Sequence, residues 1–275
     1  MFKQVGLALG ATLMAATAAS AETPLERGRY LMNSIVACGN CHTPKGPAAA
    51  GREFAGGTRM NLPVGIIHVP NITPDPETGI GKWTDVQLVA AIREGRRPDG
   101  SIIGPPMPME LYRDLSDEDV IALVAYMRSV PPVINKVSRS EYKIPLPESY
   151  GPPVVTVPPV SKQDKVAYGA YLAGPAGHCI ECHSTPGPAG APDMVNMLGA
   201  GGLEFHGPWG VSIARNITPT NLGDWSDTDI KKAITDGVRP DGSKLMPPMG
   251  YPYYKNISEF DLSAIVAYLR TLPPK

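Results

Sequence analysis

The sequence predicts an all-α protein that contains two tandem domains of similar build. Two observations support this fold class. First, the 275 residues contain one set of motifs twice, with equivalent positions 141 to 145 residues apart, as expected of a repeated structural unit. Second, each copy combines helix-start signals with apolar residues at helical spacing. The chain also has 31 prolines and 29 glycines, so we expect short helices joined by long irregular loops, which need an apolar body to pack on.

The N-terminus predicts a secretory signal peptide, Met1 to Ala21. Lys3 precedes an apolar run over residues 5–19, and Ala19-Ser20-Ala21 is a small-residue cleavage site. A retained membrane anchor would need about 20 apolar residues, and no other segment is apolar enough to cross a bilayer. We therefore expect export to the periplasm with no transmembrane segment after cleavage. The chain has 25 basic and 26 acidic residues without a basic stripe, which argues against a nucleic-acid partner.

The first helix of each copy begins at a capping signal. Thr23-Pro24-Leu25-Glu26 is a capping box with proline at the first helical position. We expect this helix to run into Cys38. In the second copy either Ser161 or Asp164 can open the equivalent helix, which ends before Cys179.

One pentapeptide then occurs in each copy, Cys38-Gly39-Asn40-Cys41-His42 and Cys179-Ile180-Glu181-Cys182-His183, and together the two use all four cysteines. C-x-x-C-H is the attachment pattern of a c-type haem. Two thiols on one turn can add to the two vinyl groups of a porphyrin, and the histidine beside them becomes an axial iron ligand. A disulfide pair, a thioredoxin-like redox pair or half of a zinc site would not require that histidine. We therefore expect two covalent haem c groups, with His42 and His183 as iron ligands. Export agrees with this, because c-type haem is attached outside the cytoplasm in bacteria.

The remaining elements repeat as well. The loops over residues 44–82 and 186–224 are rich in glycine and proline and show no periodicity, so we expect them to wrap the porphyrins. A helix follows each tryptophan: one starts at Thr84 and ends at Gly95, and its copy runs from Ser226 to Gly237. The last helices begin at residues 116 and 258 and stop before prolines at 131 and 273.

Eight of the thirty residues from Pro131 to Val160 are proline, which predicts a semi-extended linker. The expected organisation is a signal peptide at 1–21, a first domain at 22–132, the linker at 133–160 and a second domain at 161–275.

Each haem iron also needs a second axial ligand, and a ligand used by both copies should repeat. Alignment of the copies brings Pro105-Pro106-Met107 onto Pro247-Pro248-Met249. Methionine usually fills space in a core, but the repetition and the loop position favour Met107 and Met249 as iron ligands. Met109 and Met246 are nearby alternatives that do not repeat.

Three further repeated sets of residues have open interpretations. The tryptophans could donate an indole N–H to a haem propionate or could simply pack in the core. The arginines could pair with propionates or cap a turn. We expect the tyrosines to pack where the first and last helices of a domain cross. These residues are Trp83, Trp225, Arg97, Arg239, Tyr30, Tyr126, Tyr171 and Tyr268.

Together, these motifs resemble the cytochrome c subunits of bacterial periplasmic alcohol, aldehyde and gluconate dehydrogenases. The resemblance covers nearly all of both copies and includes the pentads, Asn71-Ile72-Thr73-Pro74, the Pro-Pro-Met loops and the closing Ala-Tyr-Met/Leu-Arg segment. It implies a class I cytochrome c fold in each domain, histidine and methionine ligation, and transfer of electrons from a dehydrogenase catalytic subunit to a downstream cytochrome or oxidase. Those subunits commonly have three haem domains and often a membrane anchor, whereas two domains and no anchor are predicted here. A partner could then provide any contact with the membrane.

We therefore expect a non-catalytic electron-transfer protein. The alternative is an enzyme, either a dihaem peroxidase or a thiosulfate-oxidising dihaem cytochrome. A peroxidase usually has histidine where Met107 or Met249 stands, and the thiosulfate enzymes use a cysteine ligand at one haem, but no cysteine is spare.

Overall fold

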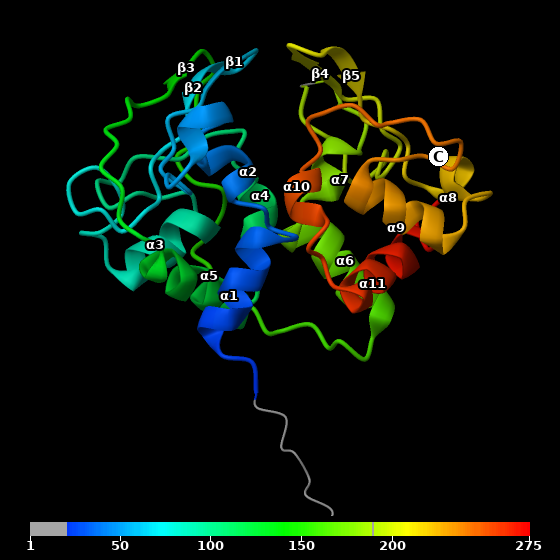
Figure 1. Cartoon of the computed structure of the whole chain (residues 1–275), viewed down its shortest axis with the longest axis horizontal. Coiled ribbons are helices and arrows are strands. Elements are labelled where there is room, and N and C mark those ends of the chain that lie inside the picture. The colour runs from blue at the N-terminus through cyan, green and yellow to red at the C-terminus, as the bar shows by residue number, and fades with distance from the viewer. Residues whose placement is uncertain (1–20, 189) are drawn as a thin grey trace, which may run out of the picture.

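The computed structural model describes residues 21–188 and 190–275, so the predicted signal peptide lies outside the described residues except for Ala21. The chain forms two similar halves that lie side by side (Figure 1). The elements of the first half are α1 (Pro24–Asn33), α2 (Gly39–His42), the short 3-10 helix η1 (Gly46–Ala49), β1 (Arg59–Leu62), β2 (Gly65–His68), α3 (Asp85–Arg93), α4 (Met109–Tyr112) and α5 (Asp117–Ser129).

The strand β3 (Glu141–Tyr142) lies in the connecting segment. The elements of the second half are α6 (Lys165–Tyr171), the π-helical turn η2 (Leu172–Ala176), α7 (Cys179–Cys182), β4 (Glu204–Gly207), β5 (Gly210–Ile213), α8 (Pro219–Leu222), α9 (Asp227–Asp236), α10 (Tyr251–Tyr254) and α11 (Glu259–Leu269).

Local sequence signals place the helix starts. Thr23 caps α1 in a capping box with Glu26, and Thr84 caps α3 in the same way with Gln87. Ser226 caps α9, which ends at Gly237 as predicted, and Asp164 rather than Ser161 caps α6.

The first helices do not run into the pentads, contrary to expectation. Helix α1 ends at Asn33, and in the second half η2 ends at Ala176. The residues directly before the first cysteine of each pentad, Ala37 and His178, have left-handed backbones with φ of 49° and 42°. A right-handed helix cannot continue through such a residue, so each pentad begins a new helical turn.

In each half the first helix packs across the last one, α1 on α5 and α6 on α11. The helices approach so closely that a Cβ at Gly28 would come within 1.9 Å of the Ala122 carbonyl oxygen. A Cβ at Gly169 would come equally close to the Ala264 carbonyl oxygen. Glycine is needed at both crossings, and the buried side chains around them belong to one apolar cluster that continues from the first half into the second.

Two small antiparallel hairpins lie inside the loops that were predicted to lack regular structure. Strands β1 and β2 form a hairpin with Arg59 opposite His68, and β4 and β5 form its equivalent with Glu204 opposite Ile213. The fold is therefore mainly helical with two small sheets, and the all-α prediction is met only in part.

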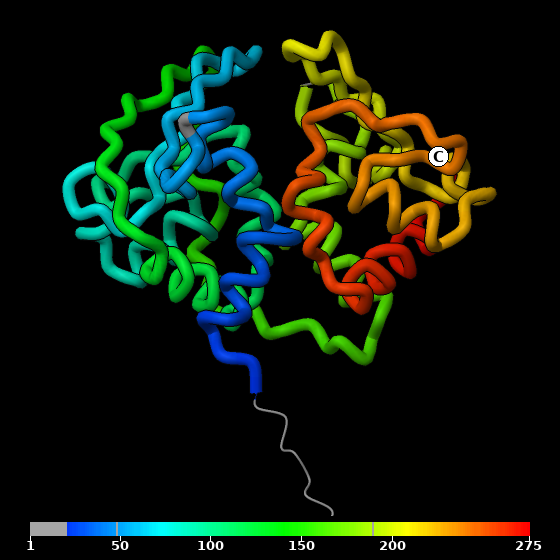
Figure 2. The backbone as a smooth tube through the Cα atoms, viewed as in Figure 1, coloured from blue at the N-terminus to red at the C-terminus, as the bar shows by residue number. Residues whose placement is uncertain are grey.

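The connecting segment does more than join the halves. Figure 2 shows it running along the outside of the first half before it crosses to the second. Strand β3 pairs with β2, placing Tyr142 opposite Gly65. The Asn71 side chain donates a hydrogen bond to the Val133 carbonyl (2.7 Å), and the Tyr150 hydroxyl donates one to the Ile103 carbonyl (2.9 Å). Much of this proline-rich segment therefore packs on the first half.

Reciprocal contacts join the two halves. The Tyr30 hydroxyl donates a hydrogen bond to Asp261 (2.7 Å) and accepts one from the Ser258 backbone N–H (3.0 Å). The Tyr171 hydroxyl donates to Asp119 (2.6 Å) and is also close to the Ser116 N–H (3.3 Å). These are the same three residues of the repeat, used once in each direction. Tyr30 and Tyr171 therefore cross to the other half, unlike the packing within one domain that we expected.

Candidate haem-binding sites

The first pentad lies on one short helical turn. Cys38 is the N-cap of α2 and His42 is its last residue. Both thiols are half-buried and free. Burial raises the pKa of the Cys38 thiol to about 12 and raises that of Cys41 as well. The second pentad forms the equivalent turn α7, where Cys179 and Cys182 are also free and half-buried.

Each pentad histidine is held through one ring nitrogen. His42 Nδ1 lies 2.9 Å from the Pro70 carbonyl oxygen, and His183 Nδ1 lies 2.6 Å from the Arg215 carbonyl oxygen. A carbonyl only accepts, so Nδ1 must carry the proton and Nε2 is left free as a ligand. Burial lowers the pKa of both histidines, which favours the neutral ring that coordinates a metal.

The predicted methionine ligands occupy equivalent places. Met107 and Met249 are both half-buried, on the loops that lead into α4 and α10, and each packs against the core. Their two alternatives differ from each other. Met109 is only 1% exposed and its sulfur lies against Gly95 in the core, whereas 41% of Met246 is exposed. The positions of Met107 and Met249 are compatible with ligation, which stays a prediction.

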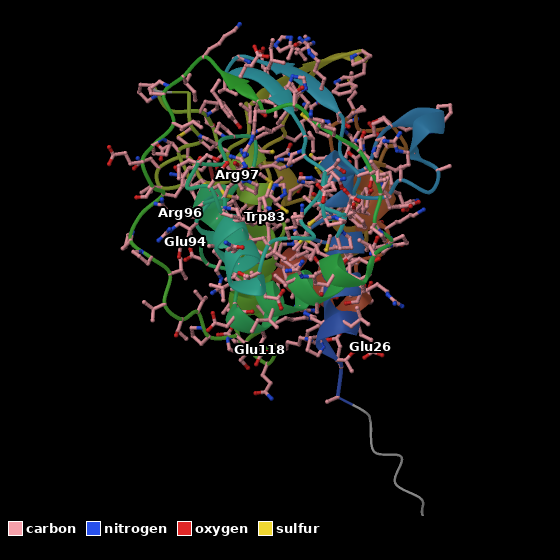
Figure 3. The ribbon with its side chains drawn as sticks, turned by 90° about the vertical axis from the view of Figure 1, so that its left-hand side faces the viewer. Glu26, Trp83, Glu94, Arg96, Arg97 and Glu118 are labelled. Carbon is pink, nitrogen blue, oxygen red and sulfur yellow. The ribbon has the colours of Figure 1, made fainter. Side chains whose placement is uncertain are left out.

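The repeated arginines hold turns. Arg97 donates to the Ile102 carbonyl (2.8 Å), and Arg239 donates to the Ser243 hydroxyl (2.9 Å) and the Lys244 carbonyl (3.1 Å). Trp83 is half-buried against the core, and its carbonyl accepts a hydrogen bond from Arg128. Trp83 and Arg97 are labelled in Figure 3. The turn-capping interpretation fits both arginines.

The two pentads face each other across the boundary between the halves. The ring of His178 lies edge-on to that of Tyr112 in the first half, with centroids 6.1 Å apart. A Cβ at Gly39 would come within 2.4 Å of the Tyr253 hydroxyl in the second half. Burial raises the pKa of the Cys182 thiol to about 12, helped by the charge of Glu181.

Several residues of this boundary were not singled out from the sequence. Tyr112 and Tyr254 are buried at equivalent positions beside the pentads. Glu181, inside the second pentad, has a pKa raised to about 7 by burial and by the charge of Glu110. Repetition of the tyrosine was visible in the sequence, but its position between the halves depends on how the two halves pack.

These sites fit the expected cofactor. Each supplies two free thiols on one helical turn, a neutral histidine with Nε2 available, and a methionine on a loop in the same half. Among residues 21–188 and 190–275, no helix is long and apolar enough to cross a membrane.

Comparison with known proteins agrees with this geometry. The family model described as cytochrome c matches residues 25–131 and again residues 166–273. The chain belongs to the cytochrome c family, and it contains two copies of that domain.

Similar proteins include dehydrogenase subunits. The chain is 32% identical to the cytochrome c subunit of a quinone alcohol dehydrogenase from Gluconacetobacter polyoxogenes, over 97% of this chain and 59% of that protein. It is also 32% identical to the gluconate 2-dehydrogenase cytochrome c subunit of Pantoea cypripedii, over 91% and 60%. The chain therefore spans about 60% of the length of these relatives. A protein described as diheme cytochrome c-type from Cereibacter sphaeroides is 32% identical over 86% of this chain and 82% of its own length.

Proposed function

We propose that this chain carries electrons through two covalently bound haem c groups, as the cytochrome subunit of a periplasmic dehydrogenase complex. The observation that carries the proposal is the placement of the two pentads on facing surfaces of the two halves, joined by reciprocal contacts. Haems attached there would be close enough for electrons to pass between them within one chain. The two haem domains would be residues 22–132 and 161–275.

The proposed roles follow the repeat. One haem would be attached at Cys38 and Cys41 and ligated by His42 and Met107; the other would be attached at Cys179 and Cys182 and ligated by His183 and Met249. When bound, such a haem supplies reversible one-electron chemistry at its iron. The carbonyls of Pro70 and Arg215 orient the histidines by accepting hydrogen bonds from their Nδ1–H groups.

With Met107 and Met249 as iron ligands in addition to His42 and His183, neither haem would offer a substrate an open coordination position. This favours electron transfer over a peroxidase, and because all four cysteines lie in the pentads, none is left to serve as the iron ligand of a thiosulfate enzyme. Substrate specificity would then belong to a catalytic partner, and a downstream cytochrome or oxidase would take the electrons.

The proposal of a dehydrogenase partner rests on the relatives, which are described as cytochrome c subunits of alcohol and gluconate dehydrogenases. The predicted signal peptide, residues 1–21, supports a periplasmic location. Attachment to a membrane would then occur through the partner complex.

The test is gentle affinity purification of the tagged protein from its own cells, with identification of each stoichiometric companion and its cofactor. We expect a dehydrogenase catalytic subunit whose substrate reduces both haems in the complex. A protein that purifies alone and turns over peroxide or thiosulfate by itself would contradict the proposal.

A further inference from the structure

The two hairpins of the repeat are equivalent, but only one has a third strand. Strands β1 and β2 correspond to β4 and β5 at a constant offset of 145 residues, with Gly65 matching Gly210. The outer edge of β2 is covered by β3 from the connecting segment. Within the described part of the chain, β5 pairs with β4 alone, so its outer edge is open.

The glycines at the hairpin edges show the same difference. A Cβ at Gly65 would come within 2.2 Å of the Glu141 carbonyl oxygen in β3. A Cβ at Gly210 would have no atom within 4 Å. Residues of the second hairpin are correspondingly exposed: Val211 by 50% and Ile213 by 53%. An open strand edge with exposed apolar side chains is a template for pairing with another chain.

The hydrogen bonds define which backbone groups are open. In the first half, Lys143 N–H donates to the Val64 carbonyl (2.9 Å) and His68 N–H donates to the Ser140 hydroxyl (3.0 Å). Their equivalents in the second half are the Trp209 carbonyl and the Ile213 N–H. Ala214 N–H donates inward to the Leu203 carbonyl (2.8 Å), so Ile213, one residue before it, points its N–H outward.

An ion pair of the first half, between Arg139 and Asp99, also has no counterpart among the described residues of the second half. The turn over residues 97–101 is repeated identically over residues 239–243. Arg139 of the connecting segment forms an ion pair with Asp99 (2.6 Å) and donates to the Ser101 hydroxyl (3.2 Å). In the second half, Asp241 is bound by the Ser243 N–H (2.8 Å) and forms no ion pair with any described residue. Its side chain is available for a cation.

We propose that β5 and the Asp241 turn form a docking site for an extended segment of a partner polypeptide. The segment adds a third strand to β4–β5, as residues 139–142 do to β1–β2. It carries a basic residue opposite Asp241 and, three positions later, an apolar residue. That residue contacts Met246, which stands where Gly104 makes room for Tyr142 in the first half. The inference rests on the proposed function only in that a partner polypeptide exists.

The chain itself supplies the probe for a test. A synthetic peptide with the sequence of residues 136–146, but with alanine in place of Tyr142 and Leu146, is titrated calorimetrically into the haem-loaded full chain. The two alanines are needed because Met246 fills the space that Gly104 leaves for those side chains in the first half. We expect saturable one-to-one binding, because the equivalent edge in the first half is already covered by its own segment. Ile213→Pro removes the outward N–H at an edge position where proline is tolerated, and we expect it to weaken binding about tenfold, since one backbone hydrogen bond and part of the apolar contact are lost.

The ion pair is tested separately. Asp241→Asn should weaken binding about threefold, the size expected for an exposed ion pair. Asp224→Asn, which removes an exposed carboxylate elsewhere in the same half, should leave it unchanged. A peptide with glutamate in place of its arginine should bind weakly to the natural chain and recover affinity with Asp241→Lys. Unchanged haem spectra and melting temperatures would show that the variants fold.

Three results would overturn the proposal: no saturable binding, binding that is insensitive to both Ile213→Pro and Asp241→Asn, or a dimer of the chain that Ile213→Pro dissolves. The last would place a second copy on the edge. Failure of peptide binding in a chain that still accepts electrons from its dehydrogenase would refute the docking site and leave the proposed function standing.

Discussion

At the scale of single residues, the proposed ligation of the haem irons by Met107 and Met249 can be tested one residue at a time. Replacement of either by alanine should open the sixth position of one haem, so about half of the ferric absorption spectrum should change from low-spin to high-spin. The reduction potential of that haem should also fall, because methionine ligation raises it. Optical spectra and redox titration of each variant measure both effects.

The matched control is Met109→Leu. Met109 is buried in the core beside Gly95, and exchange for a similar volume should cost less than about 1.5 kcal/mol of unfolding free energy without altering either haem spectrum. If the haem spectrum changed with Met109→Leu and not with Met107→Ala, Met109 and not Met107 would be the iron ligand.

Ala37 has a left-handed backbone directly before the first pentad, with φ of 49°. A side chain in this conformation costs about 1 kcal/mol that glycine avoids. Ala37→Gly should therefore raise the free energy of unfolding by about 0.5 kcal/mol, after allowance for the greater freedom of glycine in the unfolded chain. Urea unfolding followed by far-UV circular dichroism tests this. Ala90→Gly, inside α3, should have the opposite sign and cost about 1 kcal/mol.

At the scale of elements, the contact between β2 and β3 can be isolated by comparing two equivalent glycines. Both Gly65 and Gly210 have positive φ, 146° and 93°, so alanine is strained at either. Only at Gly65 would the new methyl group also overlap β3. Gly65→Ala should therefore lower the free energy of unfolding by about 2 kcal/mol more than Gly210→Ala.

Limited proteolysis gives a second measurement of the same contact. Gly65→Ala should speed cleavage within residues 133–157, because the segment loses its place on the sheet edge. Equal rates in the two glycine variants would mean that β3 does not hold the segment.

How well each element could be predicted depended on whether its signal was local. The helix starts at Thr23, Thr84 and Ser226 followed from capping residues within four positions. The hairpins were missed because their strands are four residues long and lie in glycine-rich loops, where periodicity has too few positions to register. The prolines of residues 133–160 predicted an extended segment, but its packing on the first half depends on distant partners such as Asn71.

The candidate site shows the same limit. The cysteines and histidines could be assigned because the pentad is contiguous in sequence, and the methionines could be proposed because they repeat. The contact of each pentad with the opposite half, as between His178 and Tyr112, could not be predicted, since residues from two domains meet there without any shared pattern of spacing.

At the scale of the whole molecule, the repeat produces an approximately two-fold arrangement in which each half supplies a tyrosine to the other. Arg27 also forms a bidentate ion pair with Asp119, with Nε 2.7 Å from Oδ1 and Nη2 3.0 Å from Oδ2. Tyr171 therefore binds a carboxylate already fixed within the first half. Hydrogen bonds to such charged groups contribute about 1.5 to 3 kcal/mol, so the two tyrosines should contribute strongly to holding the pentads face to face.

The tyrosines between the two halves should also make the protein less stable at alkaline pH. Burial raises the pKa of Tyr171, helped by the charge of Asp119, and burial raises that of Tyr30 as well. Above about pH 10 the unfolded chain releases these protons while the folded chain keeps them. The free energy of unfolding should therefore be unaffected by these groups below pH 9 and should fall as the pH rises beyond 10, by at most about 1.4 kcal/mol per pH unit for each tyrosine.

Urea unfolding between pH 8 and pH 11 measures that slope. Tyr171→Phe should lower the free energy of unfolding at pH 8, because the variant cannot donate the hydrogen bond to Asp119. It should also make the free energy of unfolding fall less steeply above pH 10, because one group with a raised pKa is gone. Tyr30→Phe should do the same through Asp261. The two effects should not simply add in the double variant, because Arg27 pairs with Asp119 and also lies 5.7 Å from the centroid of the Tyr30 ring, and contacts that share a partner are coupled. Equal slopes in the natural chain and the double variant would assign the alkaline decline to tyrosines outside the interface.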